Sequence, residues 1–477
     1  MVIVWTVLAV ILALVVIVLA RTVMLKPTAA ASAVVELDNS ERAVLYGEKL
    51  SKMVQKETIS APHQLDKSKF YEFHKVLEEE FPRVHKTCEK NVLDGNLLFK
   101  WKGTGEKEPI MLMSHQDVVE AGGKWEHAPF SGDIDETGRV WGRGTVDTKA
   151  SLCCIFGAIE ELITEGYQPP MDVYIASSCT EEVSGSGAPA IAKFLKDKGI
   201  KLDLILDEGG MILKAPIAGV NGIYAMVGVV EKGYGDLKFI AHGRGGHASA
   251  PGKNTPLVRL GKFMTTVEKK NPFKAQLTPT VREMFSRMAP NMIFPLKMVM
   301  ANLWLFEGLL AKVLPSINAA AGAMIRTTLA FTKAKGSDGL NVLPQTAFVT
   351  GNMRFIHHQP TDESIKLISD IAKEYDLETE VLYKDYPCPI VDFKSRQFKL
   401  VEAVMDKVYP GVGTCPYVMT GGTDCKFYTE VCDNAIRLAP IFIDEQQYAS
   451  IHGLNENIYR GALPKAVDFY KEVVKMY

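Results

Sequence analysis

The chain opens with an unbroken apolar run, after which short apolar segments alternate with amphipathic ones. Residues 2–20 carry no charge, and Thr6 is the one polar side chain among them. Because a membrane-spanning helix needs about 20 apolar residues, this run predicts a transmembrane helix at residues 1–22. A cleaved signal peptide is the alternative, but it normally begins with basic residues, and none precedes the run. We therefore expect a single-pass anchor in a membrane and leave the side of the following domain open.

The first part of the body alternates strand-like and helix-like patterns. Short apolar runs predict buried strands at residues 109–113, 172–177 and 202–206, with helices at 150–162 and 188–196 between them. This alternation predicts an α/β layered domain with a mixed, mostly parallel sheet flanked by helices. Binding sites in such sheets form beyond the carboxyl ends of the strands, and all three strands run directly into acidic or histidine residues.

A second unit interrupts this domain. It starts with a strand-like run at residues 234–241 that ends in a glycine-rich segment around His247. Further strands follow at 346–356 and 378–383, with a helix at 362–375. We predict a linker at residues 23–39, a larger domain at 40–231 and 386–477, and an inserted α+β lid or dimerisation domain at 232–385.

An apolar stretch at residues 292–314 lies within the predicted insert. Its Pro295, Lys297, Asn302 and Glu307 argue against a second transmembrane span. Two interpretations stay open: core helices of the insert, or an exposed apolar surface that receives an apolar substrate or touches the bilayer.

Length and charge narrow the range of functions. A chain of 477 residues is too long for one ordinary core, which agrees with two domains. The 54 basic and 56 acidic side chains give a net charge of −2 without a long basic run, so we expect no nucleic-acid partner. The eight cysteines show no CxxC pair and do not indicate a redox compartment.

Two candidate metal ligands come from the first motifs. His115-Gln116-Asp117 follows the first predicted strand, and a metal-binding histidine usually gives its other N–H to a carboxylate such as Asp117. Asp147 follows a glycine-rich turn and precedes a helix. One carboxylate can bridge two cations, although a helix N-cap is the alternative for this position.

The next motifs add carboxylates and a second histidine. Glu181 and Glu182 end the second predicted strand, and such adjacent buried carboxylates repel unless a metal or a proton neutralises one. Glu182 suits a ligand and Glu181 a general base for a metal-bound water; a solvated acidic turn is the alternative. Asp207-Glu208 ends the third strand and His452 lies near the carboxyl terminus, and this mixture of histidine and carboxylate is typical of zinc sites.

In combination, these motifs resemble the dizinc aminoacylases and carboxypeptidases, a family that includes aminoacylase, glutamate carboxypeptidase, carnosinase and succinyl-diaminopimelate desuccinylase. The resemblance runs from about Ser40 to the end. Carboxypeptidase S and the N-fatty-acyl-amino-acid synthase/hydrolase are the most similar branch, because both begin with an apolar segment. The resemblance implies two Zn²⁺ per chain, with Co²⁺ or Mn²⁺ as substitutes.

The resemblance also implies roles for the candidate residues. His115 and Asp207 would bind one metal, and Glu182 and His452 the other, with Asp147 bridging. Adjacent strand residues point to opposite faces, so only one of Asp207 and Glu208 can be a ligand, and the family spacing favours Asp207. Glu181 would be the general base and Asp117 would orient His115. The family fold further implies a cis peptide between Asp147 and Thr148, although relatives often carry Asp or Met in place of this threonine.

Four positions match substrate-binding motifs of the family. His247 and Asn341 would polarise the scissile carbonyl, and Arg354 would grip a substrate carboxylate. Backbone N–H groups of residues 421–424, including Gly422, would surround the same carboxylate. A turn histidine is the alternative for His247. In many relatives the insert pairs two subunits, so His247 would serve the neighbour's site in a homodimer.

The function implied is zinc-dependent hydrolysis. We expect a metal-activated water to attack the amide bond of an N-acyl amino acid, including fatty-acyl ones, or the carboxyl-terminal peptide bond of a short peptide. A plain dipeptidase or carboxypeptidase is the nearest alternative. A non-catalytic, membrane-tethered binding protein is the other, and the presence of Glu181 together with every ligand argues against it.

Overall fold

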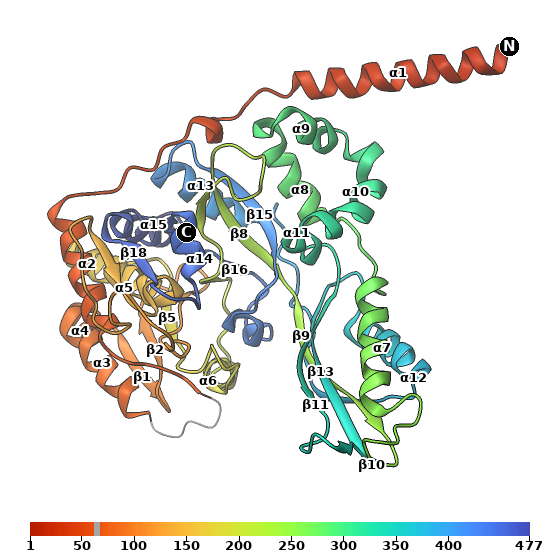
Figure 1. The fold of residues 1–477 in the computed structure, drawn as a ribbon. Coiled ribbons are helices and arrows are strands. Elements are labelled where there is room, and N and C mark those ends of the chain that lie inside the picture. The colour runs from red at the N-terminus through yellow and green to blue at the C-terminus, as the bar shows by residue number, and fades with distance from the viewer. Residues whose placement is uncertain (62–66) are drawn as a thin grey trace.

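The computed structural model describes residues 1–61 and 67–477, and its main body is built on a ten-stranded mixed sheet (Figure 1). The central strands β5, β3, β6 and β16 run parallel, and antiparallel pairs flank them. Parallel β15 lies beside β8. The predicted mixed sheet is therefore confirmed. In sheet order the strands are β1 (Glu89–Leu93), β2 (Asn96–Trp101), β5 (Val173–Ser177), β3 (Ile110–Met113), β6 (Leu204–Asp207), β16 (Ala435–Arg437), β8 (Ile223–Glu231), β7 (Ile212–Lys214) and β17 (Phe442–Ile443), with β15 (Gly413–Met419) beside β8.

Helices cover both faces of this sheet, which explains why its strands read as continuous apolar runs. In β3, Ile110 and Leu112 belong to one buried cluster, whereas Met111 and Met113 belong to a second cluster on the opposite face. The first cluster includes α5 and the second includes α6. The helices of the body are α2 (Glu41–Val54), α3 (Ser68–Glu80), α4 (Pro82–Thr87), α5 (Ala150–Thr164), α6 (Gly187–Asp197), α13 (Arg396–Val408), α14 (Glu445–Ser450) and α15 (Leu463–Met476).

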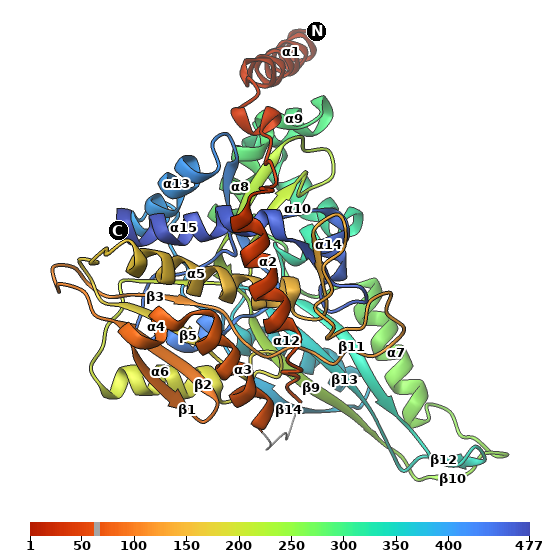
Figure 2. The same ribbon diagram turned by 90° about the vertical axis from the view of Figure 1, so that its left-hand side faces the viewer.

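A separate four-stranded antiparallel sheet follows β8 in the chain. Its residues alternate between buried and partly exposed along β9, because helices α7 and α12 pack on one face only. A short β10–β12 pair lies at the far tip of this sheet (Figure 2). The strands, in sheet order, are β11 (Thr328–Lys335), β13 (Thr346–Phe355), β9 (Gly233–His242) and β14 (Glu378–Lys384), with α7 (Pro256–Lys269), α12 (Thr361–Glu374), β10 (Gly246–His247) and β12 (Val342–Leu343).

Four helices between α7 and β11 belong to neither face of this small sheet. Helix α8 contributes Val281, Met284 and Phe285 to the core cluster of the main body and contacts β15. Helix α9 buries Met300 alone, and no residue of α10 is buried. Along α10, the apolar stretch at residues 292–314 therefore agrees with the interpretation as an exposed apolar surface. The boundaries of the inserted domain at residues 232 and 385 stay a prediction. These helices are α8 (Pro279–Met288), α9 (Phe294–Ala301), α10 (Leu303–Ile317) and α11 (Ala319–Ala323).

The amino-terminal run forms helix α1 (Val2–Met24), which projects from the body (Figure 1). Val18 and Thr22 are its buried residues. Within the described part of the chain, α1 is the one single helix that is long and apolar enough to cross a membrane, a property that a signal sequence shares. The pair α9–α10 meets the same test only when joined across a bend of 112°.

Candidate active site

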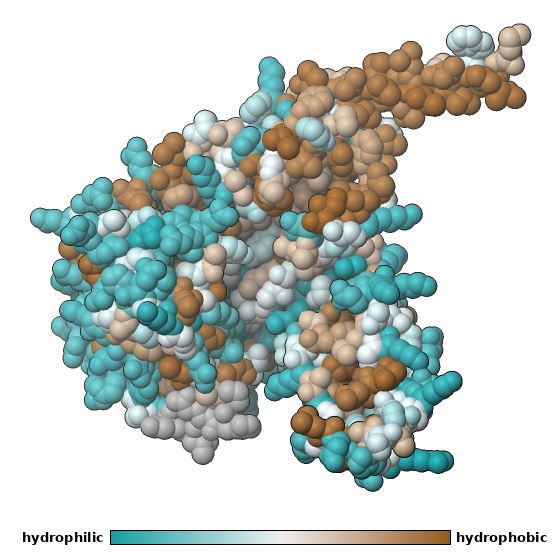
Figure 3. All heavy atoms as spheres, viewed as in Figure 1, coloured by the Kyte–Doolittle hydropathy of each residue, from teal (hydrophilic) through white to brown (hydrophobic). Residues whose placement is uncertain are grey.

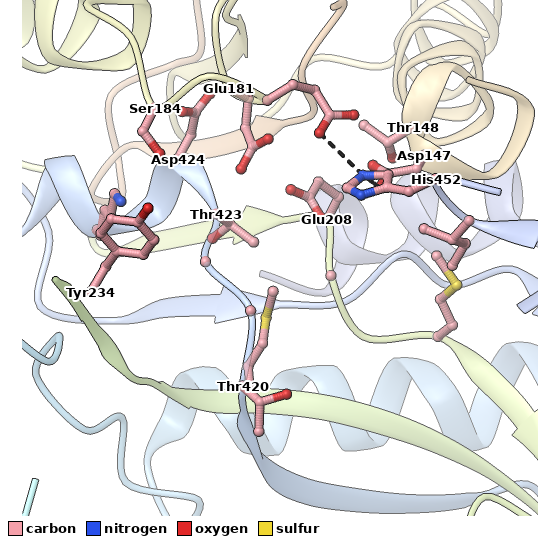
Figure 4. A pocket seen from close by; sticks show the side chains of 18 of the residues that line it. Asp147, Thr148, Glu181, Ser184, Glu208, Tyr234, Thr420, Thr423, Asp424 and His452 are labelled. Carbon is pink, nitrogen blue, oxygen red and sulfur yellow. Dashed lines mark ion pairs between the residues drawn. The ribbon is translucent and has the colours of Figure 1, made fainter. Parts of the chain in front are cut away.

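Acidic and histidine side chains from five segments converge on one pocket beyond the carboxyl ends of the central strands. Figure 4 shows Asp147, Glu181, Glu208 and His452 directed toward a common space. Because parallel strands β3, β5 and β6 end at the same edge of the sheet, residues distant in sequence meet there. The acidic and histidine residues that line the pocket are Asp147, Glu181, Glu182, Glu208, Asp424 and His452.

Asp147 lies between the two predicted histidine ligands. Its Oδ1 is 3.0 Å from Nε2 of His115, and its Oδ2 is 3.1 Å from Nε2 of His452. Each carboxylate oxygen therefore faces a different imidazole, which is the arrangement of a bridging ligand. The peptide bond between Asp147 and Thr148 is cis, as the family resemblance predicts.

Glu182 completes the cluster. Its Oε2 lies 3.1 Å from Nε2 of His452, whereas its buried Oε1 has no hydrogen-bond partner. One ligand atom each from His115, Asp147 and Glu182 lie within 4.8 Å of one another. An orphaned buried carboxylate oxygen beside imidazole nitrogens fits a cation, and this nitrogen and oxygen donor set is the one that zinc accepts.

The electrostatics of the site agree with a cation centre. Burial raises the pKa of Glu181 well above its ordinary value and raises that of Glu182. Hydrogen bonds to Asp147 and Glu182 raise the pKa of His452 to about 10. Burial would also raise the pKa of Asp147, but hydrogen bonds from His115 and His452 outweigh it and hold that pKa low. Buried negative charge of this density requires cations or protons to balance it.

Asp117 connects His115 to the two glutamates. Nδ1 of His115 is 2.9 Å from the backbone oxygen of Asp117 and 3.5 Å from its carboxylate. That carboxylate accepts hydrogen bonds from the backbone N–H groups of Glu181 and Glu182, both at 3.1 Å, and from the hydroxyl of Ser60. Asp117 thus sets the position of the Glu181–Glu182 turn as well as the histidine ring. Ser60 carried no recognisable sequence signal.

The adjacent acids Asp207 and Glu208 have different surroundings. The Asp207 carboxylate accepts the backbone N–H of Cys425 at 3.1 Å and that of Glu208 at 2.9 Å, and it does not line the pocket. The Glu208 side chain does line the pocket, and burial raises its pKa well above the ordinary value. Burial, followed by the charge of Asp207, also raises the pKa of the pocket residue Asp424 to about 7.

Glu456 is a site residue whose role the sequence left unassigned. Its carboxylate is fully buried and accepts the backbone N–H groups of Gly144, Val146 and Asp147 at 2.8–3.1 Å. It also pairs with Arg143 at 2.7 Å. Glu456 follows His452 by four positions, so it ties the loop of one histidine to the turn that carries Asp147.

Arg354 and Gly422 line the same pocket. The Arg354 guanidinium stacks over the ring of Tyr234, another residue that lines the pocket, at 4.6 Å from the ring centroid. The neighbouring backbone N–H of Thr423 is already bonded to Glu231 at 3.1 Å. The loop therefore offers fewer free N–H groups than its glycines suggest.

His247 and Asn341 lie on neighbouring segments outside the lining of this pocket. The backbone N–H of Ala248 donates to the backbone oxygen of Asn341 at 2.9 Å, and β10 pairs with β12 directly after Asn341. His247 is exposed and its Nδ1 is 2.7 Å from the Ser249 hydroxyl. Figure 2 shows this pair of strands at the far tip of the small sheet.

Comparisons with known proteins agree with this geometry. The model of a family described as peptidase family M20/M25/M40 matches residues 111–476. The chain is 32% identical to a probable carboxypeptidase S-like 2 of Dictyostelium discoideum, over 85% of this chain and 79% of that protein. It is 31% identical to the N-fatty-acyl-amino acid synthase/hydrolase PM20D1 of Xenopus tropicalis, over 93% of this chain and 88% of that protein.

A solved structure supports the fold independently. The M20 family metallo-carboxypeptidase Sso-CP2 from Sulfolobus solfataricus superposes with a TM-score of 0.67. The match covers 91% of this chain and 99% of that chain at 18% sequence identity. A sequence identity of 18% supports a shared fold, but it does not indicate a shared substrate.

Proposed function

We propose that the chain, which belongs to peptidase family M20/M25/M40, uses two Zn²⁺ to hydrolyse N-acyl amino acids. Members of this family are metallo-hydrolases that act on amide and peptide bonds. The observation that carries the proposal is the position of Asp147 between His115 and His452. Arg354 in the same pocket supports a substrate with a free carboxylate. Bound zinc would supply Lewis-acid activation of water and of the scissile carbonyl.

In the proposed site, His115 and Glu208 would hold one cation, Glu182 and His452 would hold the other, and the Asp147 carboxylate would be shared between them. Glu208 replaces Asp207 in this set because the Asp207 oxygens are engaged by backbone N–H groups, whereas Glu208 faces the pocket. Asp207 then braces the strand end.

Glu181 is the proposed general base. It lines the pocket, and its Oε2 lies 4.0 Å from the Nε2 of His115, close to the cluster but outside the closest contacts. Burial raises its pKa, so it has the affinity for a proton that a base near neutral pH needs. Glu181 takes the proton of the attacking water and later gives it to the leaving amine.

The substrate assignment rests on the lining of the pocket. Besides Arg354, the pocket wall includes the apolar side chains of Met211, Met419, Phe427 and Ile451. An apolar acyl group can lie against this wall while its carboxylate pairs with the guanidinium. The N-fatty-acyl-amino acid relative is consistent with this division of the pocket.

A direct assay tests the function. The zinc-loaded full chain should hydrolyse an N-oleoyl amino acid with a higher kcat/KM than a dipeptide of the same carboxyl-terminal residue. The reverse order would indicate a dipeptidase or carboxypeptidase. If neither substrate is hydrolysed while zinc is bound, the chain is a binding protein on this scaffold.

A matched pair of isosteric variants tests the ligand assignment. Glu208→Gln should lower the zinc content from two towards one per chain, because a carboxamide is a much weaker zinc ligand than a carboxylate. Asp207→Asn should retain zinc but lower the melting temperature, because its amide cannot accept hydrogen bonds at both former carboxylate oxygens. Zinc analysis by mass spectrometry and thermal melts measure both effects. Zinc loss confined to Asp207→Asn would restore Asp207 as the ligand.

We further propose that His247 and Asn341 act in the active site of a second copy of the chain. Both lie together at the tip of the small sheet, outside the pocket lining of their own chain. A homodimer that brings this tip to a partner's pocket would let them polarise the scissile carbonyl there.

A further inference from the structure

The exposed apolar helices α9 and α10 lie directly beside the membrane-spanning candidate α1. Figure 3 shows the hydrophobic colouring of α1 continuing onto the adjoining surface, where Figure 1 places α9 and α10. Large apolar side chains on and next to these helices are between 38% and 75% exposed: Ile293, Phe294, Trp304, Leu305, Leu309, Val313 and Ile317. A soluble monomer rarely leaves so many neighbouring apolar residues in water.

Specific contacts join α1 to this surface. Asn302 is fully buried, and its amide donates to the backbone oxygen of Val18 at 3.2 Å and to the Thr22 hydroxyl at 3.3 Å. The Arg21 guanidinium donates to the backbone oxygen of Ala301 at 3.4 Å. The carboxyl-terminal turns of α1 are therefore held against the junction of α9 and α10.

The segment after α1 is also built into the body. Ala30 is 2% exposed and belongs to the main core cluster. A side chain on Gly222 would collide with the backbone oxygen of Ala30, 2.1 Å from the Cβ position. The Thr28 N–H donates to the Asn291 side chain at 2.9 Å. Because removal of α1 and this segment would uncover core positions, the packing supports a retained helix.

We propose that α9 and α10 form a bilayer-contacting platform that lies in the membrane interface beside α1. Helix α1 has 23 residues, or about 35 Å at 1.5 Å per residue, which is enough to cross a hydrocarbon core of about 30 Å. Arg21 then lies where the span leaves the lipid, and its contact with Ala301 brings the start of α10 to the same depth.

The shape of the pair indicates contact with the surface of the bilayer and not a crossing of it. Helices α9 and α10 have 8 and 15 residues and meet at 112°, so neither is long enough to span. Glu307 pairs with Arg282 of α8 at 2.5 Å, which keeps that charge on the protein side. Trp304, half exposed near the start of α10, is the residue type enriched at the membrane interface. Contact of α9 and α10 with the bilayer does not depend on the proposed hydrolase activity.

Fluorescence quenching in a bilayer tests the platform. The full chain is placed, one copy per disc, in nanodiscs of phosphatidylcholine and phosphatidylglycerol, with or without dibromo-phosphatidylcholine. The difference between wild type and Trp304→Phe isolates the emission of Trp304. We expect brominated lipid to quench this emission severalfold, and Leu305→Glu with Leu309→Glu to abolish most of that quenching.

A second tryptophan provides the matched control. Leu382 on β14 is 50% exposed, close to the 53% of Trp304, but lies on the small sheet. The emission that Leu382→Trp adds to a Trp304→Phe background, taken as the difference from Trp304→Phe alone, should show no quenching by brominated lipid. Equal, weak quenching at both positions would overturn the proposal, as would an intact mass of the membrane-isolated protein showing that α1 has been removed. Single occupancy of each disc ensures that a second copy cannot shield Trp304.

Discussion

Glu181→Gln is expected to lower kcat for an N-acyl amino acid by about 10²- to 10⁴-fold, the usual contribution of a general base, while the zinc content stays near that of wild type. Glutamine has nearly the same shape but cannot take a proton from the attacking water. Glu181 lies at the edge of the cluster, 4.0 Å from His115, whereas the contacts among the proposed ligands His115, Asp147, Glu182 and His452 are 3.0–3.1 Å. The variant should therefore separate catalysis from metal binding.

The measurement is kcat by single-turnover and steady-state assays, combined with zinc analysis of the same preparation. Glu120→Gln is the matched control, because Glu120 is an exposed glutamate outside the lining of the pocket that holds Glu181. It should retain wild-type turnover. Wild-type rates in Glu181→Gln would show that another residue takes the proton, and loss of zinc in this variant would make Glu181 a ligand.

The part of the site that was predictable from the sequence lies at the ends of the central strands. His115, Glu182 and the pair Asp207-Glu208 each follow an apolar run by no more than five residues, and both faces of the sheet are covered by helices. Short runs of this kind predict buried parallel strands, and parallel strands bring their carboxyl ends to one edge. The convergence therefore follows from local patterns and one topological rule.

The choice between Asp207 and Glu208 was not predictable in this way. Strand alternation shows that one of the two must turn away, but it does not show which. The family spacing favours Asp207, and the proposed assignment of Glu208 rests on a contact that no local pattern contains: the backbone N–H of Cys425, 218 positions later, donates to the Asp207 carboxylate. The same holds for Glu456, whose hydrogen bonds to the Asp147 turn join segments about 310 positions apart.

For the apolar stretch at residues 292–314, the sequence pattern did not predict whether the helices are buried or exposed. Its periodicity fits buried core helices and interfacial helices equally, because both present apolar residues at helical spacing. The two cases differ in what surrounds each helix. Helix α8 packs its apolar residues into the core of the main body and buries them, whereas α10 packs against α9, α11 and the edge of that core and has no buried residue. Whether a helix is buried depends on the elements that pack around it, and the spacing of apolar residues within the helix does not specify those elements.

Asp147→Asn is expected to impair zinc binding and activity together, because among residues 1–61 and 67–477 Asp147 is the one side chain paired with both His115 and His452. Its two oxygens face Nε2 of His115 and Nε2 of His452 at 3.0 and 3.1 Å. An asparagine keeps one oxygen and turns an NH₂ group toward the other cation position, so the bridge is lost and the repulsion between two cations is no longer screened. Zinc content should fall from two to one or fewer per chain, and activity should fall by more than the roughly 10- to 100-fold that losing an outer-shell partner of a metal ligand costs.

Thermal melts with and without zinc separate this effect from misfolding. A metal that binds only the folded state raises the melting temperature, so wild type depleted by a chelator should regain a higher melting temperature when zinc is returned. Asp147→Asn should fold but show a much smaller zinc-dependent shift. Asp133→Asn, a change at an exposed aspartate, should behave like wild type. A full zinc-dependent shift with two zinc ions in Asp147→Asn would rule out a bridging role, since the cations would then be held without that carboxylate.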